Sequence, residues 1–154
     1  MDYRIVIDTN TLLRGILSET SAAAKVRRAA EARLIVPLLS KPVLDEYRAV
    51  LGHPSIALRF SISRKQVSFL IARLLFVGDY VRTPHARFEY RRDPGDRKFI
   101  ELAIELAATH IITSDNDLLS LPLAPGDAGR RFRQRLPNVV ALEAADFLNQ
   151  LRSS

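Results

Sequence analysis

The sequence predicts an α/β protein in which helices cover both faces of a mainly parallel sheet. Short apolar runs alternate along the chain with segments of helical periodicity, and parallel strands need such crossover segments. Two of the apolar runs stop directly at aspartates, as buried strands do where they reach a polar turn. The 154 residues are enough to bury one core, so we expect a single domain over residues 1–154.

Five short apolar segments are the candidate strands. The first covers residues 3–7 and ends at Asp8-Thr9-Asn10, which we interpret as a polar turn. The others cover residues 34–39, 80–83, 110–113 and 139–142. The fourth strand repeats the pattern of the first, because it also runs into acidic residues. Ligands of open α/β sheets bind beyond the carboxyl ends of the strands, so both acidic strand ends are candidate site positions.

Three helices are predicted between the first and the third strand. Residues 21–33 are rich in alanine and form the first of them. Ser40 is a suitable N-cap for the second, which ends before Gly52. Ser61 or Ser63 begins the third, in which apolar residues recur with helical spacing. That spacing predicts core packing for this helix.

The second half of the chain contains two further helix signals and one irregular segment. Residues 93–96 favour the start of a helix, and residues 144–151 form the last one. Glu101 and Glu105 fall opposite the apolar stripe of the helix that follows residue 96, so we expect both to be solvated. Residues 122–137 are rich in glycine, proline and arginine, and we interpret them as a mobile connection.

Asp8 and Asp115 occupy equivalent positions at the ends of two predicted strands. Each has an ordinary alternative role, because an aspartate after a strand often caps the segment that follows. Asn116 and Asp117 also compete with Asp115 for any role in a site. Two acids at equivalent strand ends nevertheless favour a shared function at one edge of the sheet.

Helical geometry brings Glu46 and Asp96 toward the same edge. Glu46 lies at the border of the apolar stripe of its helix, whereas Asp45 points away from it. The alternative for Glu46 is a solvated helix residue. Asp96 lies on the buried side at the start of its helix, although it and Asp93 are also natural N-caps there.

Carboxylates that gather at one sheet edge repel one another unless a cation neutralises them. Oxygen ligands without cysteine or clustered histidine suit Mg²⁺ or Mn²⁺ better than zinc. Such an ion lowers the pKa of a bound water and stabilises the leaving oxygen in phosphodiester hydrolysis. The acidic residues therefore predict a site that hydrolyses phosphodiester bonds with a divalent metal.

The net charge of +6 favours a polyanionic partner such as nucleic acid, although a GC-rich genome would also raise the arginine content. Together with an acidic site, two groups of arginines are candidate contacts to RNA phosphates. They are Arg87, Arg91 and Arg92 in one segment, and Arg130, Arg131, Arg133 and Arg135 in another.

Several other classes of protein are excluded or disfavoured. The absence of cysteine excludes disulfides, thiolate zinc sites and a cysteine nucleophile. His53, His85 and His110 share no spacing, so a catalytic histidine is not expected. The apolar run near the N-terminus is too short for a secretory signal and meets an acid at Asp8. No run approaches the roughly 20 apolar residues of a membrane helix. We expect a cytoplasmic protein that does not enter a membrane.

Four motifs, in order and spacing, resemble those of the PIN-domain nucleases. They are Ile5 to Asn10, Ser40 to Tyr47, Asp93 to Phe99, and Ile112 to Leu119. Within that superfamily the chain looks most like the toxins of toxin–antitoxin operons that are related to VapC-type ribonucleases. The likeness extends over nearly the whole chain. The segment of residues 125–135, however, is longer than the corresponding segment expected in this branch of the family.

The resemblance implies a three-layer α/β/α sandwich with a roughly five-stranded sheet, and an endoribonuclease that depends on Mg²⁺ or Mn²⁺. It implies that the catalytic acids are Asp8, Glu46, Asp96 and Asp115. Of these, Asp8, Asp96 and Asp115 would bind the metal. Five further residues would line the site, namely Thr9, Asn10, Asp93, Thr113 and Asp117. The implied partners are an RNA substrate, a cognate antitoxin and a second copy of the chain.

Three alternatives to the toxin remain open at this stage. A PIN nuclease that works in RNA maturation would show the same motifs. A PIN module that binds RNA without cleaving it would share the fold, although the complete set of acids disfavours it. A phosphoacceptor receiver domain would need paired acids after the first strand and a lysine near the last one, and the chain has neither.

Overall fold

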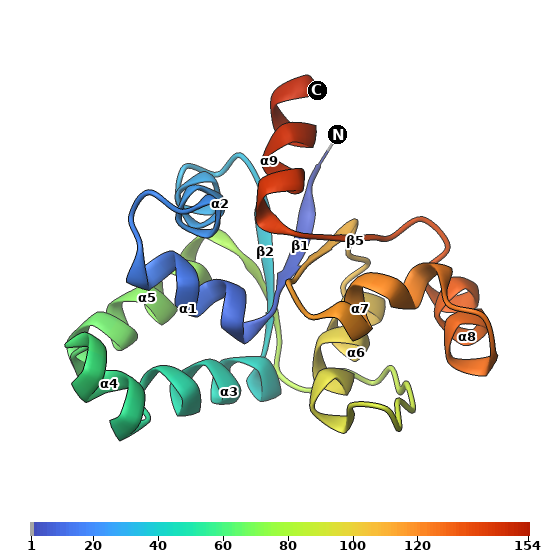
Figure 1. Ribbon diagram of the computed structural model, residues 1–154, viewed down its shortest axis with the longest axis horizontal. Coiled ribbons are helices and arrows are strands. Elements are labelled where there is room, and N and C mark those ends of the chain that lie inside the picture. The colour runs from blue at the N-terminus through green and yellow to red at the C-terminus, as the bar shows by residue number, and fades with distance from the viewer. Residues whose placement is uncertain (1) are drawn as a thin grey trace.

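The computed structural model describes residues 2–154 and contains one parallel sheet of five strands in the order β3-β2-β1-β4-β5 (Figure 1). The strands are β1 (Arg4–Ile7), β2 (Val36–Ser40), β3 (Asp79–Val81), β4 (His110–Ile112) and β5 (Val140–Leu142). The predicted α/β class is thus confirmed. Successive strands step outward from β1 to β3, and β4 then pairs with the other side of β1. The topological switch point, where such sheets bind ligands, lies between β1 and β4.

Helices cover both faces of the sheet, which confirms the three-layer arrangement (Figure 1). One side carries α1 (Thr9–Leu17), α2 (Ala22–Glu31), α3 (Lys41–Leu51), α4 (Pro54–Phe60) and α5 (Arg64–Val77). The other side carries the 3₁₀ turn η1 (Pro94–Asp96), α6 (Arg97–Glu105), α7 (Asn116–Ser120), the 3₁₀ turn η2 (Leu121–Leu123) and α8 (Asp127–Arg135). The last helix, α9 (Ala144–Ser153), packs against α2.

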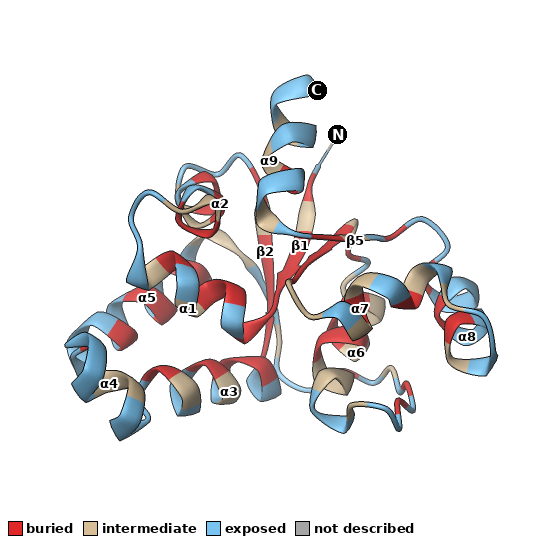
Figure 2. Cartoon of the chain, in the orientation of Figure 1, coloured by how far each residue is buried: buried red, intermediate tan, exposed pale blue. Residues whose placement is uncertain are grey.

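The core fills the space between the sheet and the two helical layers. Its strand residues include Ile5, Leu38 and Ile111, and its helix residues include Tyr47 and Leu102, all of which are fully buried. Figure 2 shows that the buried positions of most helices lie on their inner sides, whereas α4 has no buried residue. Burial of each large apolar side chain contributes roughly 1.5–3 kcal/mol, so the two layers are held by packing rather than by helix propensity.

Two helices are present where the sequence indicated turns. Helix α1 begins directly after Asp8, whose side chain caps it by accepting a hydrogen bond from the amide of Thr11 at 2.8 Å. Gly15 allows α1 to approach α2 closely, since a Cβ atom there would lie 3.0 Å from the carbonyl carbon of Ala23. Helix α4 starts at Pro54, shortly after Gly52, where the sequence predicts only the end of a helix.

The prediction of a mobile connection over residues 122–137 is wrong, because most of this segment is the helix α8. Phe132 anchors the helix, with only 1% of its surface exposed and an edge-to-face contact to Phe88 at 6.3 Å between ring centroids. Gly129 is buried against the chain before the helix, where a Cβ atom would lie 2.0 Å from the carbonyl oxygen of Ala124. The buried ring of Phe132 and the close backbone contact at Gly129 thus hold α8 in place, where a mobile segment was expected.

Of the alternatives for α5, Ser63 begins the helix with a complete capping box, and Ser61 ends α4 instead. Within residues 2–154, no helix has the length and the apolar character that crossing a membrane requires.

Candidate active site

The site is built on the carboxyl ends of β1 and β4, the two strands that flank the switch point. Asp8 follows β1 and is 94% buried, leaving 6% of its surface exposed. One of its carboxylate oxygens caps α1, and the other accepts a hydrogen bond from the hydroxyl of Thr113 at the end of β4. The Thr113 hydroxyl in turn accepts a bond from the amide of Asp115 at 2.9 Å. This relay ties the two predicted strand-end acids to each other.

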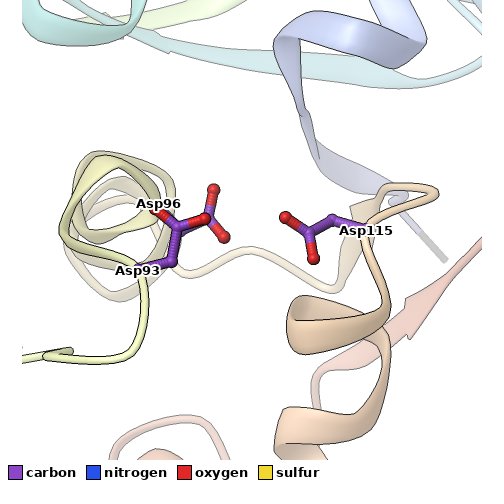
Figure 3. Close-up of side chains that lie close together, drawn as sticks. All are labelled: Asp93, Asp96 and Asp115. Atoms are coloured by element: carbon purple, nitrogen blue, oxygen red, sulfur yellow. The ribbon is translucent and has the colours of Figure 1, made fainter.

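Three aspartates come together beside this relay. Oxygen atoms of Asp93, Asp96 and Asp115 all lie within 4.8 Å of one another, and each residue is half-buried. Figure 3 shows Asp93 and Asp96 on one side, around the start of α6, and Asp115 facing them from the start of α7. Asp93 and Asp115 are also caps, of η1 and α7 respectively, so their backbone positions are fixed by hydrogen bonds.

Asp96 is the member of this cluster whose surroundings demand a cation. It makes no capping hydrogen bond, and its buried Oδ2 atom has no hydrogen-bond partner among residues 2–154. Burial first, and then the charges of Asp93 and Asp115, together raise the pKa of Asp96 to about 7. A divalent ion would satisfy the unpaired oxygen and remove the repulsion. The donor set, which is oxygen only, fits Mg²⁺ or Mn²⁺.

Glu46, from α3, is also at this edge but is paired differently. Its Oε1 atom accepts a hydrogen bond from the ammonium of Lys98 at 2.6 Å, and its Oε2 atom accepts one from the hydroxyl of Thr9. The Glu46 and Lys98 side chains keep 26% and 28% of their surface exposed. Lys98 is not among the site residues predicted from the sequence, because its contact with Glu46 joins residues that lie 52 positions apart.

The residue after Glu46 fixes α3 against β1. Tyr47 is fully buried, and its hydroxyl donates a hydrogen bond to the carbonyl oxygen of Ile7 at 2.5 Å. Burial raises the pKa of Tyr47, and the nearby charges of Asp8 and Glu46 raise it further. The phenol therefore stays neutral and acts as a donor, which holds Glu46 beside the end of β1.

The expectation of solvation is wrong for Glu101, which is mostly buried, and both Glu101 and Glu105 hold the loop that leads from β3 to the site. Glu101 accepts a hydrogen bond from the amide of Phe88 at 3.0 Å. Glu105 accepts bonds from the amides of His85 and Ala86, and these bonds lower its pKa. The loop is thereby attached to α6, the same helix that carries Asp96 at its start.

The remaining residues that were predicted to line the site differ in their burial and in their bonding partners. Thr9 and Thr113 are buried and bonded to Glu46 and Asp8 as described, whereas Asn10 is exposed on the first turn of α1. Asp117 forms an ion pair with Arg92 at 2.9 Å. The structure thus groups Asp93, Asp96 and Asp115, links Asp8 to them through Thr113, and leaves Glu46 with Lys98.

A cavity of about 680 Å³ lies between the loop before η1 and α8. None of the three clustered aspartates lines it, but Asp117, whose amide donates a hydrogen bond to Asp115, does. Four of the predicted RNA-binding arginines line it, namely Arg91, Arg92, Arg130 and Arg131. The other three are used within the protein, because Arg87, Arg133 and Arg135 each donate hydrogen bonds to backbone carbonyls. Tyr90, which is buried, also lines the cavity, and burial followed by the charge of Asp117 raises its pKa.

Comparison with known proteins supports the resemblance that the motifs suggested. The family model for the PIN domain matches residues 4–117, which include all four motifs' acids but not α8. An uncharacterized protein of Methanocaldococcus jannaschii is 29% identical over 127 residues, covering 77% of this chain and 74% of its own length. No solved structure matches the chain.

Proposed function

This chain belongs to the PIN-domain family, a nuclease fold, and on that premise we propose that it is a metal-dependent endoribonuclease that hydrolyses RNA phosphodiester bonds. The observation that carries the proposal is the unpaired, buried oxygen of Asp96 within the cluster of three aspartates. A structural role would satisfy this oxygen with a hydrogen bond, because leaving it unpaired is costly. A site prepared for a cation leaves it free.

Asp93, Asp96 and Asp115 would hold a Mg²⁺ or Mn²⁺ ion. When bound, such an ion lowers the pKa of a water molecule and stabilises the charge of the leaving oxygen. The chain supplies the orientation: Thr113 holds the carboxylate of Asp8, and the Tyr47 hydroxyl holds the end of β1. We propose Asp8 and Glu46 as the two further acids that orient water and substrate beside the cluster.

We expect the purified protein to cleave RNA only when Mg²⁺ or Mn²⁺ is present. The three aspartates cannot bring a water molecule to reactivity without a cation, so a chelator should stop cleavage and added metal should restore it. The measurement is the time course of cleavage of several unrelated RNAs, separated by length. Cleavage that continues in excess chelator would exclude this mechanism.

We further propose that the cavity between the loop before η1 and α8 takes the phosphates of the RNA. Arg91 and Arg131 have no acidic partner within 4.0 Å among residues 2–154, so their guanidinium groups are available to an anion. The guanidinium of Arg131 lies over the ring of Phe88, at 5.2 Å from the centroid, which fixes its direction. Arg92 and Arg130, in contrast, are paired with Asp117 and Asp127.

Replacing Arg91 or Arg131 with alanine is expected to weaken RNA binding and its dependence on salt. Each lost phosphate contact should reduce the slope of log K against log salt by about 0.7 for a single strand. The measurement is the anisotropy of a labelled single-stranded RNA at several salt concentrations, with Asp96→Asn in every protein to prevent cleavage. Arg59→Ala, in α4 on the opposite layer, is the matched control and should leave affinity and slope unchanged.

The role as a toxin, with a cognate antitoxin and a homodimer, stays a proposal that rests on the motif resemblance. The charge of the chain and the nuclease fold are compatible with a role in which RNA cleavage arrests growth. Co-purification with the product of a neighbouring reading frame, and loss of RNA cleavage in that complex, would support an antitoxin as the partner.

A further inference from the structure

We propose that this site holds a single divalent ion, and that the ammonium of Lys98 takes the place of a second cation at Glu46. The inference rests on the proposed nuclease function and specifies which of the acids bind the metal and which acid is neutralised by Lys98. Lys98 is then a positioning residue that decides how many metal ions the site accepts. It lies in α6, two residues after Asp96, so one helix start supplies both an acid of the cluster and the neighbouring positive charge.

The division follows from which carboxylate oxygens already have partners. Both oxygens of Asp8 accept hydrogen bonds, from the amide of Thr11 and the hydroxyl of Thr113. Both oxygens of Glu46 are engaged as well, by Lys98 and Thr9. Among residues 2–154, the buried side-chain oxygen without a hydrogen-bond partner belongs to Asp96 of the cluster. The oxygen that is available to a metal therefore lies at the cluster and not at Glu46.

Charge leads to the same conclusion. Glu46 and Lys98 form a neutral pair at 2.6 Å, with about a quarter of each side chain exposed. A second divalent ion at Glu46 would have to displace the ammonium and then remain close to it, and both steps are unfavourable for like charges. Because Thr9 holds the second oxygen of Glu46, the carboxylate is also not free to rotate toward the cluster.

The test is a titration of the metal-stripped full chain with Mn²⁺ alone, in which free Mn²⁺ is counted by electron paramagnetic resonance. We expect one ion per chain in the native protein, and a second, weaker ion in Lys98→Met, which keeps the unbranched side chain as far as Cε but removes the charged ammonium. Lys98→Arg should restore a single ion. Lys98→Met combined with Glu46→Gln should also bind one, because the freed carboxylate is then gone.

A matched control is available on α3. Lys41 pairs with Asp45 at the same distance of 2.6 Å, but this pair is exposed and lies away from the cluster. Lys41→Met should still bind one ion. Thermal unfolding in chelator shows that each variant is folded before it is titrated.

A second test is the same Mn²⁺ titration of Glu46→Gln, which keeps Lys98. If Glu46 ligates a second ion in the native protein, Glu46→Gln will reduce two ions to one.

Two ions in the native protein, or a single ion in folded Lys98→Met, would overturn the inference. Neither result depends on RNA, so failure here is separate from failure of the proposed function. Two ions together with RNA cleavage would remove the role of Lys98 and leave the nuclease. One ion per chain without cleavage of any RNA would support the role of Lys98 and contradict the proposed nuclease function.

Discussion

Asp96→Asn is expected to lose RNA cleavage by on the order of 100-fold or more and, at the same time, to stabilise the metal-free protein. The amide keeps the shape of the carboxyl group but carries no charge to hold a divalent ion. The same change removes one of three mutually repelling carboxylates and gives the unpaired buried position a group that can donate to Asp93 or Asp115. A loss of function combined with a gain in stability is typical of a strained binding site.

The gain in stability should depend on pH in a defined direction. The carboxyl group of Asp96 has an ordinary pKa of 3.8, which the folded protein raises to about 7. Folding therefore favours the protonated form, and this contribution to stability is present at low pH and lost as the pH rises from about 4 through 7. The difference between Asp96→Asn and the native chain should be largest at pH 8. Because Asp96 is only partly buried, we expect a difference on the order of 1 kcal/mol.

The measurements are the cleavage rate in Mg²⁺ and the melting temperature in chelator at pH 5 and pH 8. Added Mg²⁺ should raise the melting temperature of the native protein, because an ion that binds only the folded state stabilises it, but not that of Asp96→Asn. Asp45→Asn is the matched control, since Asp45 is exposed and pairs with Lys41 on the far side of α3. It should keep both cleavage and the metal response. An active Asp96→Asn would rule out the assigned site.

Phe132→Ala is expected to lower the free energy of unfolding by about 3–5 kcal/mol. Phe132 is the buried anchor of α8, and its loss leaves a cavity against Phe88 that the surrounding side chains cannot fill completely. Phe88 also supports the guanidinium of Arg131, so RNA affinity should fall together with stability. Urea unfolding followed by circular dichroism gives the first quantity, and RNA anisotropy gives the second.

Phe76→Ala is the control, because Phe76 lies on α5 with 77% of its surface exposed and makes only a cation–π contact with Arg33. This substitution should cost no more than about 1 kcal/mol. If residues 122–137 were a mobile connection, Phe132→Ala would cost as little as the control. Equal effects of the two substitutions would therefore contradict the packing of α8.

The strands were predictable because each contains a short apolar run, but their order in the sheet was not predicted and is known from the structure. The missed helices have physical explanations. The first turns of α1 contain Thr9, Asn10 and Thr11, which favour turns over helices, so the helix depends on its cap at Asp8 and on packing against α2. Helix α8 is dominated by arginines, and only Phe132 among its large side chains is buried. Tertiary packing decides both cases.

The acids of the site were predictable as a group, and their partners were not. Strand ends and helix faces indicated that Asp8, Glu46, Asp96 and Asp115 belong to one edge of the sheet. Sequence spacing carries no information about an ion pair such as Glu46–Lys98, which forms only when α3 and α6 meet at that edge. The ligand set predicted from the resemblance, Asp8 with Asp96 and Asp115, stays a prediction, whereas the structure places Asp93 in the cluster.

The bond between Thr113 and Asp8 spans 105 residues, and this separation matters while the protein is being made. A ribosome delivers Asp8 and Glu46 early, but Asp115 emerges only after most of the chain has been synthesised. A nascent or prematurely released chain that stops before β4 lacks Asp115, and β1 then has no β4 beside it to complete this edge of the sheet. On the proposed function, an unfinished chain would therefore lack a complete metal site and would leave the RNA of the translation machinery around it intact.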